Sequence, residues 1–255
     1  MRRLRHLAGQ HRTVSINRLL GVLLAFVAGA INAGGFLVVG MYTSHMTGFA
    51  SMLADNLILG NIGLLLGALG TVLAFVAGAA TTAVLVNWAR QNHLRSEYAL
   101  PLLTEAGLLL LFGLMGATLN RQTPFAVPLT VLVLAFTMGL QNAVVSKISA
   151  SQIRTTHMTG VITDLGIELG KLLYWNRTQT PNSVQVRANR GKLRLFSMLL
   201  AAFMTGGLVG AAGFKYLGFI WVLPMATLLL LLSLPPLYAD LQRWLRRHRI
   251  IEHCP

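Results

Sequence analysis

Six long apolar stretches constrain this chain more than any other feature, because each is long enough to cross a membrane. The hydrocarbon core of a bilayer is about 30 Å thick, and roughly 20 apolar residues of helix cross it. With 55% hydrophobic and only 11% charged residues, the chain is also too apolar for a soluble globule. We therefore predict an all-α polytopic protein that forms a single membrane domain over residues 1–255. Its six transmembrane helices are expected at residues 18–41, 61–89, 99–119, 124–146, 193–214 and 217–238.

The basic residues predict the orientation of these helices. Cytoplasmic loops of membrane proteins collect Lys and Arg. With a cytoplasmic N-terminus, every Lys and Arg except Arg121 and Lys215 falls on the inner side, so both termini are expected in the cytoplasm. The net charge of +14 is then explained without nucleic acid as a partner. Residues 187–194 and the basic tail at 239–255 are placed to contact anionic lipid headgroups.

A duplicated tetrapeptide indicates that the chain consists of two repeats. His45-Met46-Thr47-Gly48 recurs as His157-Met158-Thr159-Gly160, and each copy follows an Asn-Ala pair, Asn32-Ala33 or Asn142-Ala143. The two spacings differ by two residues. We place the first repeat at residues 18–119 and the second at 124–238.

Each repeat contains three predicted spans, and this odd number has a topological consequence. The second repeat must enter the membrane from the opposite side, so the two repeats are expected to be inverted. Such repeats are the architecture of many secondary transporters, in which broken helices meet near the midplane.

A short apolar segment follows the first span of each repeat, at residues 49–59 and 161–175. Eleven residues of helix reach about 16 Å, roughly half a bilayer. Each segment therefore either re-enters the membrane as a broken helix or lies in the interface. Asp164, Glu168 and Lys171 fall on one stripe of the second segment, which fits a solvated face or a water-filled cavity equally.

The repeated residues are the candidate binding site. A Gly-terminated turn that opens a short helix leaves backbone amides that favour an anionic group. Thr47 and Thr159 could cap these helices or donate to a ligand, and His45 and His157 are natural proton carriers. A mid-span Asn is either a packing amide or a ligand-binding group. The predicted substrate-binding set is Asn32, His45, Thr47, Gly48, Gln141, Asn142, His157, Thr159 and Gly160.

Three acidic residues are candidates for coupling transport to an ion gradient. Asp55 and Asp164 lie on the two short segments. Glu105 is the only acidic residue inside a predicted span, about one turn from its cytoplasmic end. At that depth we expect its side chain to snorkel or to pair with Arg95 or Lys171.

Several kinds of chemistry have no support in the sequence. No Ser or Cys nucleophile has a His and an acid at usable spacing, and no Gly-rich phosphate loop is present, so we predict neither an enzyme nor a cofactor. The only cysteine, Cys254, allows no disulfide. His45 and His157 are expected on opposite membrane faces, where they cannot share a metal ion unless both short segments re-enter.

The motif regions resemble a known family. The residues that carry the likeness are Gly29, Asn32-Ala33, Phe36-Leu37, Met46-Thr47-Gly48, Gly139-Leu140-Gln141-Asn142-Ala143, Thr155-Thr156 and Met158-Thr159-Gly160. With these the chain resembles the YoaK-like family of bacterial integral membrane proteins, a domain family of unknown function. The resemblance implies six spans in a bacterial inner membrane and brings no substrate.

The chain departs from this family's pattern at two positions. Asn32 stands where the family favours an acid, and Phe49 stands where it favours Asn. An amide does not titrate in the physiological range, so proton coupling through Asn32 is excluded here.

We predict a secondary transporter or flippase for an unidentified small molecule, which works by alternating access. The alternative is a non-transporting membrane scaffold or assembly partner, in which the repeated motifs only pack and cap helices. The Gly-rich helix faces allow a homodimer in either case.

Overall fold

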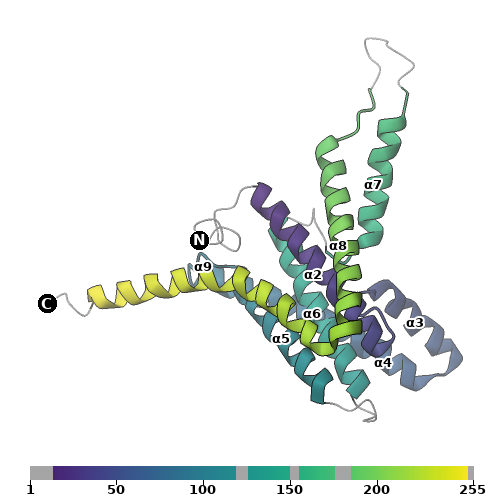
Figure 1. The fold of residues 1–255 in the computed structure, drawn as a ribbon, viewed down its shortest axis with the longest axis horizontal. Coiled ribbons are helices and arrows are strands. Elements are labelled where there is room, and N and C mark those ends of the chain that lie inside the picture. The colour runs from purple at the N-terminus through teal and green to yellow at the C-terminus, as the bar shows by residue number, and fades with distance from the viewer. Residues whose placement is uncertain (1–13, 119–125, 150–154, 176–184, 252–255) are drawn as a thin grey trace.

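The computed structural model describes residues 14–118, 126–149, 155–175 and 185–251, and over these residues the protein is all-helical (Figure 1). This confirms the predicted fold class. Residues 1–13 and Cys254 lie outside the described residues. The elements in chain order are α2 (Val14–Val39), α3 (Met46–Leu59), α4 (Ile62–Gln91), α5 (Ala99–Thr118), α6 (Ala126–Ile148), α7 (Met158–Leu173), α8 (Arg190–Leu217), the 3₁₀ turn η1 (Gly218–Trp221) and α9 (Val222–Ile251).

Five stretches of the described residues are long and apolar enough to cross a membrane. They are Ile16–Val39, Ile62–Gln91, Ala99–Gly116, Pro128–Ile148 and Arg190–Arg243. The last has 54 residues and contains α8 and most of α9, which are joined through η1. One straight helix of that length would measure about 80 Å, more than twice the roughly 30 Å hydrocarbon core. The chain turns at Gly218, where φ is 64°, and α9 leaves in a different direction from α8 (Figure 1).

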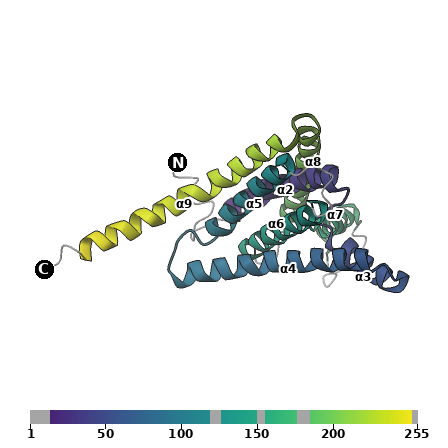
Figure 2. The ribbon, with the colours of Figure 1, turned by 90° about the horizontal axis from the view of Figure 1, so that it is seen from below.

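The helices pack in pairs that combine the two halves of the chain. Helix α2 packs against α8, α4 against α6, and α5 against α9. The short helices rest on the following long ones, α3 on α4 and α7 on α8, and α2 also contacts α6. Figure 2 shows α6 running beside α4. Exchanging α2 with α6, α3 with α7 and α4 with α8 converts the α2–α8 pair into the α6–α4 pair and the α3–α4 pair into the α7–α8 pair, and it leaves the α2–α6 pair unchanged.

The two principal crossings share one construction, a Phe-x-x-Gly sequence on each helix that meets. A Cβ atom added to any of these four glycines would lie 2.0–2.1 Å from a phenylalanine carbonyl oxygen of the opposite helix. Such close approach of two helices requires glycine. The contacts join Gly29 to Phe203 and Gly206 to Phe26 between α2 and α8, and Gly78 to Phe136 and Gly139 to Phe75 between α4 and α6.

Both short helices begin earlier than the sequence predicts. Helix α3 begins at Met46 and α7 at Met158, so Met-Thr-Gly forms the first turn of each helix and does not precede it. Among the described residues, the glycines with positive φ are Gly40, Gly60 and Gly218. The glycine of the tetrapeptide therefore terminates no turn, and the interpretation of a Gly-terminated turn was wrong.

Helix α9 also continues beyond its predicted end. We expected the last span to end at residue 238, just after Pro235-Pro236, but the helix passes through both prolines and continues to Ile251. A proline removes a backbone donor and bends a helix without always ending it. The next turn is held against α5, because the Asp240 carboxylate accepts the Ser96 N–H at 2.8 Å and forms an ion pair with Arg243. The part of the basic tail that the structure describes is therefore helical.

Candidate functional site

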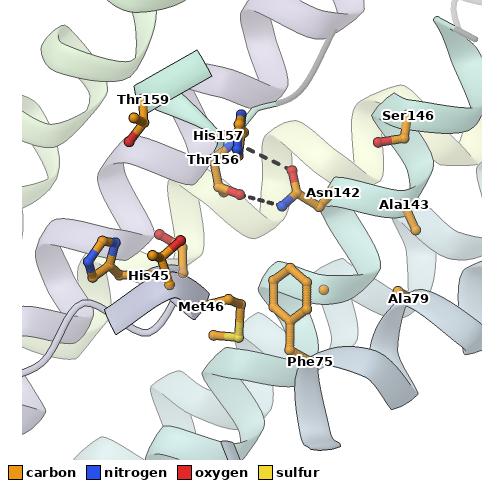
Figure 3. A pocket seen from close by; sticks show the side chains of 13 residues that line it. His45, Met46, Phe75, Ala79, Asn142, Ala143, Ser146, Thr156, His157 and Thr159 are labelled. Atoms are coloured by element: carbon orange, nitrogen blue, oxygen red, sulfur yellow. Dashed lines mark hydrogen bonds between the residues drawn. The ribbon is translucent and has the colours of Figure 1, made fainter. Parts of the chain in front are cut away.

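Both copies of the tetrapeptide border one cavity of about 480 Å³. His45, Met46 and Thr47 contribute from the first copy, and His157 and Thr159 from the second (Figure 3). Helices α4 and α6 supply the remaining walls together with the residues that precede the two histidines. These further lining residues are Ser44, Phe75, Ala79, Gly139, Asn142, Ala143, Ser146 and Thr156.

The two histidines occupy the same position relative to their helices. His45 immediately precedes α3 and His157 immediately precedes α7, and neither side chain caps its helix through a hydrogen bond. Thr47 and Thr159 lie inside the first turns, so the expectation that they cap these helices was wrong. The first N–H groups of each helix thus have no capping side chain, and helix geometry gives them no partner within the helix.

The spacing from histidine to glycine has a steric explanation. A Cβ atom added to Gly48 would lie 2.4 Å from Cδ2 of His45, and one added to Gly160 would lie 2.4 Å from Nδ1 of His157. Each imidazole ring is therefore folded back over the first turn of its own helix. Glycine leaves the space in which the ring lies, which fixes the direction of the histidine at the cavity wall.

The two repeated asparagines hold the segments that lead into the motif. The Ser44 hydroxyl donates to Oδ1 of Asn32 at 2.8 Å. In the second half, Nδ2 of Asn142 donates to the Thr156 hydroxyl, and Oδ1 of Asn142 accepts from the Thr156 N–H at 3.4 Å (Figure 3). Ser44 and Thr156 each directly precede the motif histidine. Both asparagines thus fix the start of a short helix beside the last two turns of the preceding long one.

The structure brings together some of the predicted site residues and separates others. Asn142, His45, Thr47, His157 and Thr159 line the cavity. Gln141 is fully buried away from it and donates to the Leu24 carbonyl of α2 at 2.7 Å. Asn32 is buried behind Ser44 and is not a lining residue.

The three coupling candidates lie in different surroundings. Asp55 and Asp164 are exposed on α3 and α7. Glu105 is fully buried on α5, and neither carboxylate oxygen has a hydrogen-bond partner among the described residues. The expectation that it snorkels or pairs with Arg95 or Lys171 was wrong, because Lys171 instead forms an ion pair with Glu168 at 2.9 Å.

That ion pair lies on α7, which is not among the five stretches able to cross a membrane. Glu168 is buried and also accepts the Asn189 N–H at 2.7 Å. The hydrogen bond from Lys171, followed by the one from the Asn189 backbone, holds the pKa of Glu168 below its ordinary value. Glu168, one of the three residues of the predicted polar stripe on α7, therefore has a structural role, because it joins α7 to the start of α8.

The shared cavity changes the expectation for the histidines. We expected His45 and His157 on opposite membrane faces, and the structure places both at one cavity.

Within the described ranges, no group of three or more His, Cys, Asp or Glu side chains could hold a metal ion. The cavity's lining residues include neither Lys nor Arg. Any attraction for negative charge therefore comes from the partial positive charge at the N-termini of α3 and α7, whose first turns border the cavity.

Ser44, Ser146 and Thr156 were not among the predicted site residues. A signal existed for Ser44 and Thr156, because each is a hydroxyl residue directly before the duplicated histidine. Ser146 has no such signal, since it follows Asn142 by one helical turn and only the position of α6 brings it to the cavity.

The long apolar helices define a helical protein of the multi-pass membrane type. The chain belongs to the family whose model is described as "Protein of unknown function (DUF1275)", which matches residues 20–234. This is the family that the motif residues resemble. No curated protein and no solved structure matches the chain.

Proposed function

We propose that this protein is a secondary transporter or flippase of the bacterial inner membrane, with both termini in the cytoplasm. The observation that carries the proposal is that both copies of the duplicated motif line one cavity. A site built equally from two repeats is what alternating access requires, because exchanging the conformations of the repeats then exposes the same site to the other side.

The packing of the helices supports two inverted three-span repeats. Because α2 packs on α8 as α6 packs on α4, with reciprocal Phe-x-x-Gly contacts at both crossings, the two halves make equivalent contacts. Counting α8 and α9 as separate spans gives six. An odd number of spans in each repeat then inverts the second relative to the first.

The hydrogen bonds of the asparagines support re-entry of both short helices. Helix α3 has 14 residues and is about 21 Å long, too short to cross a roughly 30 Å core. The bond from Ser44 to Asn32 places its start about two turns back from the end of α2. Helices α3 and α7 are therefore half-helices whose N-termini meet at the binding site, as in the broken helices of other transporters.

The composition of the cavity favours a substrate with an anionic or hydrogen-bond-accepting group. Two uncapped helix N-termini attract negative charge. Thr47, Thr159 and Asn142 supply neutral donors, and His45 and His157 supply a donor and, when protonated, a charge. Asp55, Asp164 and Glu105 are the proposed coupling residues, with Glu105 first because it is buried without a partner.

Cysteine accessibility tests the proposal. In a background without Cys254, single cysteines at Ala33 and Ala143 are exposed to a membrane-impermeant maleimide from each side separately. Ala143 lines the cavity, so we expect labelling from both sides. A cysteine at Lys215, a position predicted at the outer surface, should label only from outside, and a cysteine at Ala226, which is buried on α9, should not label. If Ala143 labels from one side only or not at all, alternating access is wrong.

A membrane scaffold is the second candidate function, favoured by the asparagine hydrogen bonds. Both amides are engaged by the protein itself, which is what a packing device would show. This function predicts that Asn142→Ala lowers thermal stability in detergent, and a fully stable variant would count against it.

A further inference from the structure

A second cavity of about 460 Å³ lies beside the first and has a different character. It is a groove between α3, α4 and α6 that opens to the outside, since Leu64 and Leu66 of its lining are more than half exposed, and its walls are almost entirely apolar. Representative lining residues are Phe49, Met52, Leu64, Leu66, Val131 and Leu132. Of its lining residues only Thr71 carries a side-chain polar group, and this hydroxyl donates to the Gly67 carbonyl of its own helix.

The two cavities follow one another along the same three helices. On α4, Thr71 lines the apolar cavity and Phe75, one turn further, lines the polar one. On α3, Thr47 lines the polar cavity and Phe49 the apolar one. Residues three or four apart lie on one helix face, so a ligand that follows α4 from one cavity meets the other about one turn away.

Missing side chains create the apolar cavity. A Cβ atom added to Gly63 or Gly67 would meet nothing within 4 Å, and one added to Gly70 would meet only Leu132, at 3.4 Å. These glycines are not needed for helix contact, in contrast to Gly78, whose added Cβ would clash with the Phe136 carbonyl. Glycine in a helix interior is unfavourable, and here it leaves space that the protein itself does not fill.

We infer that the substrate is amphipathic, with one anionic or hydrogen-bond-accepting headgroup that binds between His45 and His157 and an alkyl tail that lies in the apolar cavity. The inference rests on the proposed function and specifies its substrate class. A small polar solute would not use this groove, whereas the alkyl tail of an amphipathic substrate packs against its apolar walls while the headgroup stays at the polar cavity. A single tail fits, because one such cavity adjoins the polar site along α4.

Photocrosslinking tests the inference on the full-length protein in lipid nanodiscs. The probe is palmitate with a diazirine in its tail, and crosslinked residues are identified by mass spectrometry. We expect crosslinks on α3, α4 and α6 within the apolar cavity. Unlabelled palmitate or hexadecyl phosphate should compete for these crosslinks, and hexadecane, which has no headgroup, should not.

A matched pair of variants separates the cavity from the lipid-facing surface. Gly67→Leu fills the apolar cavity without a steric clash, and we expect cavity crosslinks to fall about tenfold or more. Gly107→Leu is the control, because Gly107 also has nothing within 4 Å but lies on α5 and lines neither cavity. Replacing both His45 and His157 with Ala should make palmitate compete no better than hexadecane.

Three results would overturn the inference: equal competition by hexadecane, equal crosslinking in Gly67→Leu and Gly107→Leu, or crosslinks confined to lipid-facing residues such as Ile58. The first two would mean that the cavity holds bulk acyl chains only. The labelling of Ala143 keeps the two proposals distinct. If the cysteine at Ala143 labels from both sides but the apolar cavity gives no specific crosslinks, the amphipathic substrate is rejected and the transporter proposal stands. If the cavity gives specific crosslinks but the cysteine does not label from both sides, transport is rejected and binding of an amphipathic ligand stands.

Discussion

Ser44 donates a 2.8 Å hydrogen bond to Asn32, and this bond joins the residue before the motif histidine to a point about two turns before the end of α2. Thr156 and Asn142 form the corresponding pair between the approach to α7 and α6. The depth at which each short helix begins is therefore set by one side-chain pair in each half. The same pairs bring the two histidines to a shared cavity.

The first prediction concerns these asparagines. Asn32→Ala removes a partner from the Ser44 hydroxyl, and loss of one partly buried hydrogen bond costs about 1–2 kcal/mol. We expect a lower midpoint of thermal unfolding in detergent. Because Asn32 and Ser44 are bonded to each other, Ser44→Ala combined with Asn32→Ala should lower the midpoint by less than the sum of the single changes. Strictly additive effects would show that the two side chains do not interact.

Asn142 allows transport to be separated from packing. Its conservative replacement Asn142→Asp keeps the size of the side chain but removes the Nδ2 donor to Thr156. Under the transporter proposal, flux in proteoliposomes is lost while the amount of protein in the membrane stays unchanged. If flux and membrane abundance fall together, the scaffold function is favoured instead.

The glycines at the helix crossings should tolerate no side chain. In Gly78→Ala the new Cβ would lie 2.0 Å from the Phe136 carbonyl oxygen, so two backbones would have to separate. Overpacking of this kind costs about 1–3 kcal/mol and occasionally more. We expect a clear fall in the thermal midpoint, measured by size-exclusion chromatography after heating. Gly107→Ala, which meets nothing within 4 Å, should leave the midpoint unchanged or raise it.

The motif glycines should behave differently from the crossing glycines. In Gly160→Ala the new Cβ meets the His157 ring, a side chain that can rotate, and not the backbone. We expect nearly unchanged stability and a fall in flux of about tenfold or more, because a misplaced binding group loses its geometry. His157→Ala should have a comparable effect on flux. A Gly160→Ala variant with full flux would show that the ring direction is unimportant.

The sequence allowed the all-helical class and five residues that line the candidate cavity to be predicted, because apolar length and duplication are one-dimensional signals. Spans of about 20 apolar residues and a recurring His-x-x-Gly can be read without knowing any contact. The duplicated Asn-Ala pair also identified Asn142, which lines the cavity.

Features that depend on the path of the backbone could not be predicted from apolar length or from the duplication. The meeting of His45 and His157 follows from how far α3 and α7 turn back, which the sequence left open. Gln141 shows a second limit: successive residues on a helix point about 100° apart, so motif membership did not reveal that Gln141 faces α2 while Asn142 faces the cavity. The isolation of Glu105 likewise arises from packing by distant helices.

Glu105 gives the last prediction, since its carboxyl group is fully buried on α5 and neither oxygen is bonded to a described residue. An unpaired carboxyl group inside an apolar span is a target for the apolar carbodiimide dicyclohexylcarbodiimide, which enters from the hydrocarbon. Mass spectrometry should find the adduct on Glu105 and none on Asp55, which is exposed. Glu105→Gln should fold with unchanged or higher thermal stability, because an amide matches the acid in size and carries no charge. If Glu105 is the coupling residue, the same variant loses accumulation against a gradient while it keeps downhill exchange. An unreactive Glu105, or a variant that still accumulates substrate, would remove this residue from the coupling mechanism and leave Asp55 and Asp164 as the remaining candidates.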